Sequence, residues 1–234
     1  SQALSSIKDQ LQKTSKRPLI VFVNGQTGSG KSFFAQSLEK KLHAEQITGF
    51  QLETDLYNND RFTPDDFTQH KTAWESGESF TRHDMHARKD VAVTETPDVI
   101  VISGGGATTE LTGIDSELSV IVDTEPLTRI GRRIFRDHIT DTDGEPNPDA
   151  FLKALAEDEG LLKEFSEHQK DLEKQKAKAN ILVDNHVEPG PDDPQLSISN
   201  GALHFKARYD NIDYDLTQPI SPERLVELKS SLGF

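Results

Sequence analysis

The sequence predicts an α/β fold built on a doubly wound, mostly parallel β-sheet. Several short apolar runs have the length and composition of buried parallel strands: residues 19–24, 98–103, 119–123 and 180–184. Segments with helical spacing of apolar residues separate most of these runs, and strands that alternate with helices are typical of a parallel sheet. A glycine-rich turn follows the first run and another follows the second, as expected at the carboxyl edge of such a sheet.

The first glycine turn is residues 25–32, Gly-Gln-Thr-Gly-Ser-Gly-Lys-Ser, and it fits the phosphate-binding pattern G-x-x-x-x-G-K-[ST] without a mismatch. Phe34, Leu38 and Leu42 recur every four residues after it, which predicts the amphipathic helix that the motif requires. The glycines allow backbone N–H groups to converge on an anion, and the helix N-terminus adds partial positive charge. We therefore expect a P-loop NTPase fold that binds ATP. The predicted phosphate-binding residues are Gly25, Gln26, Thr27, Gly28, Ser29, Gly30, Lys31 and Ser32. Lys31 would reach the terminal phosphates, and the Ser32 hydroxyl would hold Mg²⁺.

The other elements follow in order along the chain. Residues 1–17 carry apolar residues at helical spacing, and 49–52 form a second predicted strand. Residues 57–90 are polar and predict loops and short helices. A helix is predicted over 126–137, opening with a proline, and 150–179 carry a long, charged helical pattern.

Residues 188–194 hold three prolines and a glycine, which predicts a linker. Beyond it, alternating apolar residues around Asn200-Gly201 predict a hairpin with a type I′ turn, then a third strand and a helix capped by Ser221. The predicted organisation is an N-terminal helix (1–17), a kinase-like domain (18–187), the linker and an appendage (195–234). The appendage is expected to be structural or to mediate homo-oligomerisation rather than to hold a second active site.

Composition limits the partners. The chain has 234 residues, 33% of them hydrophobic, and a formal net charge of −14. Such a surface repels nucleic acid and anionic membranes, so neither is expected as a partner. Cysteine is absent, which excludes disulfides and thiolate metal sites. With no apolar run of membrane-spanning length, a soluble, cytoplasmic protein is expected.

An aspartate follows the second predicted strand in Glu53-Thr-Asp55-Leu-Tyr57. A carboxylate there lies at the carboxyl edge of the sheet, where doubly wound folds place their ligands. Asp55 is therefore a candidate general base for an attacking hydroxyl and a candidate Mg²⁺ ligand, and a turn or helix-cap role is the alternative. The guanine-specific N-K-x-D motif of switch GTPases is absent.

Together these segments resemble the uridine kinase and phosphoribulokinase family of P-loop small-molecule kinases over roughly residues 18–187. Besides the loop, the matching stretches are Asp55-Leu-Tyr57, Gly77-Glu-Ser-Phe80 with His83-Asp84-Met85-His86-Ala87-Arg88, and Val122-Asp-Thr124 with the arginine-rich 129–137. The resemblance implies an ATP- and Mg²⁺-dependent transfer of the γ-phosphate to a hydroxyl of a small metabolite.

The resemblance also implies individual roles. Asp55 would be the general base and Lys31 would act on the transferred phosphoryl group. The residues implied for the acceptor pocket are Tyr57, His83, His86, Arg88 and Arg133, and Arg136 would face the triphosphate. The alternatives from the residues themselves are a solvated helix face for the arginines and an ordinary polar loop for the histidines.

The chain departs from the family pattern at several places, among them Phe62, where nucleoside kinases have an aspartate before a proline, and a shorter acceptor loop. Two further departures concern Mg²⁺ and the lid. Ser103-Gly104 stands where the family has a glutamate that helps to hold Mg²⁺, and His138–Asp143 lacks the family's lid arginines. These departures favour an alternative, a non-catalytic or regulatory ATP-binding protein of the same fold. A kinase of the zeta-toxin type, acting on a macromolecule or an activated sugar nucleotide, is a further alternative. For a small-molecule kinase the acceptor stays open among nucleosides, sugar phosphates, pantothenate and glycerate.

Overall fold

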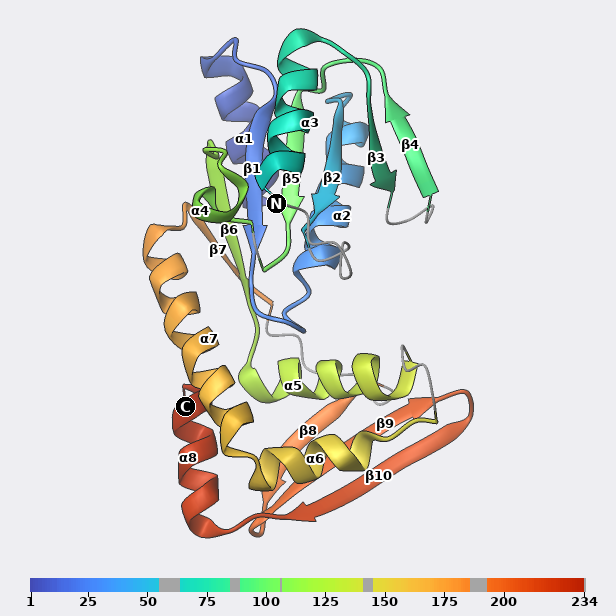
Figure 1. Ribbon diagram of the computed structural model, residues 1–234, viewed down its shortest axis with the longest axis vertical. Coiled ribbons are helices and arrows are strands. Elements are labelled where there is room, and N and C mark those ends of the chain that lie inside the picture. The colour runs from blue at the N-terminus through green and yellow to red at the C-terminus, as the bar shows by residue number, and fades with distance from the viewer. Residues whose placement is uncertain (55–63, 85–88, 106, 141–144, 186–192, 234) are drawn as a thin grey trace. The chain divides into compact units, whose positions relative to one another are not determined.

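The computed structural model describes residues 1–54, 64–84, 89–105, 107–140, 145–185 and 193–233, which form two compact units (Figure 1). The first unit comprises Ser1–Gly25, Gly30–Val122 and Lys178–Val183. The second comprises Gln26–Ser29, Asp123–Ala177 and Asp184–Phe234. This partition groups residues 195–234 with the helices that follow residue 125, whereas a separate appendage was predicted from the sequence. The sequence-based boundaries at 17, 187 and 194 stay predictions.

A five-stranded sheet forms the centre of the first unit, in the order β2-β5-β1-β6-β7. Its strands are β1 (Leu19–Asn24), β2 (Gly49–Glu53), β5 (Val99–Ser103), β6 (Leu118–Asp123) and β7 (Ile181–Asp184). β1 pairs in parallel with both β5 and β6, and β2 pairs in parallel with β5. The predicted doubly wound, parallel sheet is confirmed, and β1, which leads into the glycine loop, is its central strand.

Alternate residues of β1 belong to different cores on the two faces of the sheet, as a strand buried on both sides requires. Leu19, Val21 and Val23 pack with α1 (Gln2–Lys13) and α2 (Lys31–Ala44). Ile20 and Phe22 pack with Trp74 of α3 (Pro64–Ser76) on the opposite face. A short α4 (Thr109–Thr112) follows β5. Helices therefore cover both faces of the sheet and hold β1, the strand that leads into the loop, in place.

The described residues between 57 and 90, which are 64–84 and 89–90, depart from the predicted loops and short helices. α3 runs for 13 residues, and β3 (Phe80–Asp84) pairs antiparallel with β4 (Lys89–Val93). The Phe80 ring explains why so polar a segment is ordered here. Its centroid lies 5.0 Å from that of His70, 5.7 Å from that of Phe50 and 6.1 Å from that of Trp74. One aromatic side chain thus ties the start of the hairpin to α3 and the sheet.

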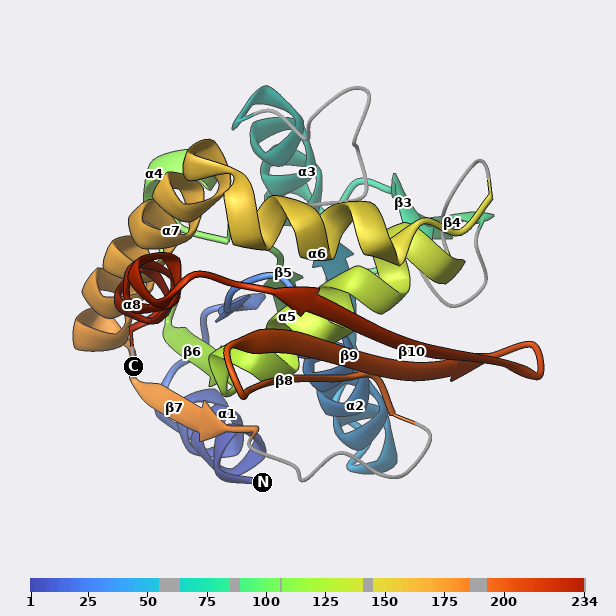
Figure 2. The ribbon, with the colours of Figure 1, turned by 90° about the horizontal axis from the view of Figure 1, so that it is seen from below.

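The second unit combines helices with an antiparallel sheet in the order β10-β9-β8 (Figure 2). Its elements are α5 (Pro126–Phe135), a π-helix η1 (Arg136–Thr140), α6 (Pro148–Glu157), α7 (Glu159–Lys178), β8 (Gln195–Ser199), β9 (Ala202–Tyr209), β10 (Ile212–Pro219) and α8 (Pro222–Leu232). Asn200 and Gly201 have φ of +50° and +69°, which confirms the left-handed turn between β8 and β9. Asp210 and Asn211, with φ of +49° and +63°, form a similar turn that was not predicted from the sequence.

Two predicted helices of this unit end earlier than expected. The helix predicted over 126–137 is α-helical only to Phe135, after which η1 begins. The long pattern over 150–179 is interrupted at Asp158, whose backbone is extended and whose carboxylate accepts hydrogen bonds from the N–H groups of Gly160 and Leu161. Asp158 therefore starts α7 as a side-chain cap, a role that the helical periodicity alone did not reveal. Among the described residues, no helix is both long and apolar enough to cross a bilayer.

Arg224 of α8 stabilises this interruption. Its guanidinium donates hydrogen bonds to the carbonyl oxygens of Leu155 and Asp158, and the residue is only 8% exposed. The carbonyls at the end of α6 have no partner within their own helix, so a buried cation is well suited to them.

We expect Arg224→Ala to lower the free energy of unfolding by about 1–3 kcal/mol, because it removes the guanidinium donor from the buried Leu155 carbonyl and from the Asp158 carbonyl. Urea denaturation of the full chain measures the change. Arg208→Ala on β9 is the matched control, since that side chain is 54% exposed and forms a surface ion pair with Asp213 at 3.6 Å. The control should cost less than about 0.5 kcal/mol. Equal effects of the two substitutions would contradict the capping role.

Candidate functional site

The loop begins at Asn24, the buried last residue of β1. The Asn24 side-chain oxygen accepts a hydrogen bond from the Gly25 N–H at 2.9 Å, and its amide donates to the Ala107 carbonyl at 3.4 Å. The loop ends at Gly30, whose φ of +87° suits glycine and which directly precedes the first residue of α2. The strand–loop–helix arrangement predicted from the motif is therefore confirmed.

The tip of the loop, Gln26–Ser29, belongs to the second unit and lies against α5. Gly28 has φ of +81°, and a Cβ at this position would lie 2.3 Å from the carbonyl oxygen of Arg129. A side chain is thus excluded both by the backbone conformation and by the space. The close approach accounts for the glycine at this position of the motif.

Side chains of the second unit bind the carbonyl oxygens of the tip. The Ser29 carbonyl accepts hydrogen bonds from Thr124 Oγ1 at 2.9 Å and from Asn185 Nδ2 at 2.8 Å. Arg132 Nη1 lies 3.4 Å from the Gly28 carbonyl oxygen. Within the tip, the Ser29 N–H donates to the Gln26 carbonyl at 3.0 Å. These hydrogen bonds together fix the peptide planes of the tip, as a preorganised anion-binding loop requires. Neither Thr124 nor Asn185 was assigned a role from the sequence, although each follows a predicted strand directly.

Arg129 is the buried cation beside the tip. It is 6% exposed, and its guanidinium donates a hydrogen bond to Gln26 Oε1. Burial lowers its pKa to about 10, against the opposing charges of Asp123 and Glu125. Because this pKa lies well above 7, Arg129 keeps its positive charge at neutral pH.

An ion pair joins α7 to Asp123, the last residue of β6. Lys176 Nζ lies 2.7 Å from Asp123 Oδ2 and 3.1 Å from Glu173 Oε1. Burial alone would lower the pKa of Lys176, but its hydrogen bonds to Asp123 and Glu173 outweigh burial and raise that pKa. The aspartate of the Val-Asp-Thr stretch is therefore occupied with positioning α7.

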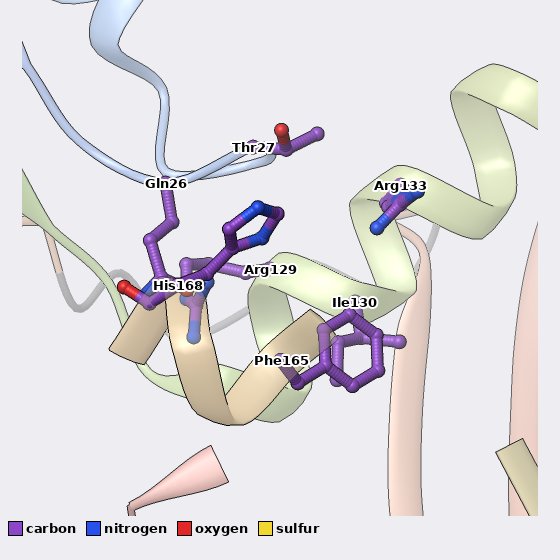
Figure 3. Close-up of a pocket in the computed structure, with 7 residues that line it drawn as sticks. All are labelled: Gln26, Thr27, Arg129, Ile130, Arg133, Phe165 and His168. Carbon is purple, nitrogen blue, oxygen red and sulfur yellow. Dashed lines mark hydrogen bonds between the residues drawn. The ribbon is translucent and has the colours of Figure 1, made fainter. Parts of the chain in front are cut away.

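A small pocket opens beside the tip (Figure 3). Its lining residues are Gln26, Thr27, Arg129, Ile130, Arg133, Phe165 and His168. Gln26 Nε2 donates to the His168 carbonyl at 3.0 Å, which fastens the tip to α7. Two guanidinium groups, an imidazole and a phenyl ring suit a planar or anionic group.

The arginines of 129–136 have different surroundings. Arg129 and Arg132 hold the loop tip, as described above. Arg133 forms ion pairs with Glu164 at 3.3 Å and Asp137 at 3.5 Å, and its Cζ lies 5.6 Å from the ring centroid of Phe151. Arg136 Nε lies 2.6 Å from Asp137 Oδ1, and its side chain is half exposed. The roles predicted for Arg133 at the acceptor and for Arg136 at the triphosphate stay predictions.

The P-loop lysine and serine lie in the first turn of α2, in the first unit. Lys31 is buried. Ser32 Oγ donates a hydrogen bond of 2.5 Å to Glu53 Oε1, at the end of β2. Glu53 Oε2 in turn accepts from Gln51 Nε2 at 2.9 Å, and Gln51 Nε2 also lies 2.7 Å from Ser103 Oγ. A carboxylate therefore faces the predicted Mg²⁺ ligand Ser32, and no role was predicted for this glutamate from the sequence.

This donor set fits Mg²⁺. No group of three or more His, Cys, Asp or Glu side chains that would enclose a metal occurs among the described residues. Mg²⁺ does not need such a cage, because it keeps several waters and takes one or two carboxylates together with substrate phosphates. One hydroxyl and one carboxylate at the end of a phosphate-binding loop match that preference.

Several predicted residues lie outside the described part of the chain. They are Asp55, Tyr57, His86 and Arg88, together with positions 141–143 of the proposed lid. His83 lies on β3, in backbone register with Asp90 of β4. The structure thus places the tip residues beside Arg129 and Arg132 in the second unit, and Ser32 beside Glu53 in the first. The acceptor residues and the general base stay predictions.

Comparison with known proteins adds one family match. The Zeta toxin family model matches residues 3–59, which include β1, the loop, α2 and β2. No curated protein matches the sequence.

Among solved structures, the matches include a provisionally named fructose transport system kinase from Silicibacter sp. TM1040, at 15% identity and TM-score 0.49, covering 76% of this chain and 97% of that one. A possible uridine kinase from Bacillus stearothermophilus matches at 13% identity and TM-score 0.42, covering 79% of this chain and 100% of that one. The YGR205w protein matches at 13% identity and TM-score 0.41, covering 93% of this chain and 95% of that one. Identities of 13–15% and TM-scores below 0.5 do not indicate the activity of this chain.

We expect Gly28→Ala to weaken ATP binding by about tenfold or more, because its Cβ would displace the tip from the Arg129 carbonyl. Isothermal titration with ATP measures the loss. Gly77→Ala is the matched control, since Gly77 has a similar φ of +72° but no atom of the described residues lies within 4 Å of where its Cβ would stand. The control should lose about 1 kcal/mol of stability and no ATP affinity. Parental affinity in Gly28→Ala would show that the contact with Arg129 does not position the loop.

Proposed function

We propose that this protein is an ATP-dependent phosphotransferase that moves the γ-phosphate of ATP to a hydroxyl of a small metabolite, in the manner of uridine kinase-like enzymes. The observation that carries the proposal is the complete phosphate-binding motif directly after the central strand, with Gly28 in a left-handed conformation and Ser32 hydrogen-bonded to Glu53. The kinase-like motifs downstream of the loop favour phosphoryl transfer over a switch or a motor.

The proposed chemistry rests chiefly on positioning and charge. Phosphoryl transfer gathers negative charge on the transferred oxygens, and Lys31, loop N–H groups and Mg²⁺ would offset it. Asp55 would accept the proton of the attacking hydroxyl. The predicted acceptor residues Tyr57, His83, His86, Arg88 and Arg133 offer hydrogen bonds and positive charge, which suit a polar or anionic acceptor. Arg136 would contribute at the triphosphate.

A second candidate is a kinase of the zeta-toxin type. The match of that family's model to residues 3–59 favours it, because the matched segment holds the loop and the strand that ends at Glu53. The two candidates share the nucleotide chemistry and differ in the acceptor. Phosphorylation of an activated sugar nucleotide would identify the second candidate, whereas phosphorylation of a small metabolite would identify the first.

We expect a panel of acceptors to separate these candidates. ADP release from Mg-ATP is measured with nucleosides, sugar phosphates, pantothenate, glycerate and nucleotide-activated sugars, each against a reaction without acceptor. Stimulation by one small hydroxyl compound supports the first candidate, and stimulation by an activated sugar supports the second. ATP binding without stimulation by any member of the panel would contradict transfer to these acceptors and favour a regulatory role or an acceptor outside the panel.

We expect Asp55→Asn to reduce phosphoryl transfer by about 10²–10⁴-fold while the Kd for ATP changes little, because only the proton acceptor is lost. Asp9→Asn is the matched control: it removes one negative charge at an exposed position of α1, far from Asp55 in the sequence, and should leave the rate unchanged. Transfer at the parental rate in Asp55→Asn would show that Asp55 is not the base.

A further inference from the structure

The contact between Ser32 and Glu53 has no assigned role in the chemistry proposed so far. Glu53 is 6% exposed, and burying a carboxylate is costly unless its oxygens are bound. Both oxygens have donors: Ser32 Oγ lies 2.5 Å from Oε1, and Gln51 Nε2 lies 2.9 Å from Oε2. Ser32 of α2 and Gln51 of β2 therefore hold the Glu53 carboxylate in one orientation.

The direction of the hydrogen bond decides what the serine can do. An ionised carboxylate only accepts hydrogen bonds, so the Ser32 hydroxyl must be the donor. The hydroxyl proton stays on Ser32 and points at Glu53, so the lone pairs of Oγ are directed away from Glu53, toward another partner. A metal ion needs those lone pairs. The contact thus prepares the P-loop serine as a ligand.

The pairing of β2 with β5 places the Glu53 carboxylate next to position 103. Glu53 on β2 lies beside Ser103 on β5 in the parallel pairing, and Gln51 Nε2 connects the two by hydrogen bonds. A carboxylate at position 103 would place a second negative charge next to Glu53. This edge of the sheet therefore carries one acidic group on β2 and a hydroxyl at the neighbouring position on β5.

We propose that Glu53 is a positioning residue for Mg²⁺ at the nucleotide site: it accepts the hydrogen bond of the Ser32 hydroxyl, so that the lone pairs of Ser32 Oγ would be available to the metal. Gln51 and Ser103 hold the carboxylate in place. The inference rests on the proposed nucleotide-binding function, and it concerns the metal affinity of the nucleotide complex rather than the acceptor.

Mn²⁺ serves as the probe, because its binding to the ADP complex is followed by electron paramagnetic resonance without any turnover. We expect Glu53→Gln to weaken Mn²⁺ binding to the ADP complex by about 10–100-fold, the range for residues that orient metal ligands. ADP binding in the presence of a chelator should stay unchanged. Glu53→Asp keeps the charge and should restore part of the affinity. Glu45→Gln, at the far end of α2, is the matched control and should have no effect.

A double-mutant cycle with Ser32→Ala separates positioning from a structural role. If Glu53 acts through the Ser32 hydroxyl, Glu53→Gln should lose most of its effect on Mn²⁺ affinity once that hydroxyl is absent. Additive effects, or unchanged Mn²⁺ affinity in Glu53→Gln, would overturn the inference while leaving nucleotide binding intact. Failure of the parental protein to bind ADP at all would instead overturn the proposed function, and this inference with it.

Discussion

The approach of Gly28 to the carbonyl oxygen of Arg129 is the constraint on which the rest of the candidate site depends. It places the loop tip against α5 with no room for a side chain. Once the tip lies there, Thr124 and Asn185 bind the Ser29 carbonyl and Arg132 reaches the Gly28 carbonyl. The carbonyl ends of these peptide dipoles are then occupied by the protein. The peptide planes of the tip are thereby fixed before any ligand binds, as a phosphate-binding loop requires.

Charge is distributed unevenly along this acidic chain. The formal net charge is −14, yet residues 129–136 hold four arginines within eight positions. Arg129 is buried and stays charged at neutral pH because its pKa is still about 10. Burying an arginine that holds a loop is costly, and the hydrogen bond to Gln26 offsets part of that cost. Positive charge is therefore retained where an anionic nucleotide would need it, in a protein that otherwise repels anions.

The sequence predicted those parts that depend on local patterns. The parallel strands follow from apolar runs, the loop from its eight-residue motif, and the β8–β9 turn from Asn200-Gly201. It did not predict the β3–β4 hairpin, because Phe80 anchors the start of that hairpin through a contact with Phe50, which is distant in the chain. Asn185 and Glu53 were overlooked for the same reason. Their partners, Ser29 and Ser32, are far away in sequence, and only the folded chain brings them within hydrogen-bonding distance.

The most direct test of nucleotide binding at this loop is equilibrium binding of Mg-ATP to the full chain, with the parental protein compared with Lys31→Ala. Lys31 is the loop residue expected to reach the terminal phosphates, so its loss removes charge without altering the backbone of the loop. We expect one saturable site with a Kd between about 1 μM and 1 mM, strongly weakened in a folded Lys31→Ala variant. Equal binding by both proteins, or none by the parental chain, would contradict the assignment of the loop as a nucleotide site.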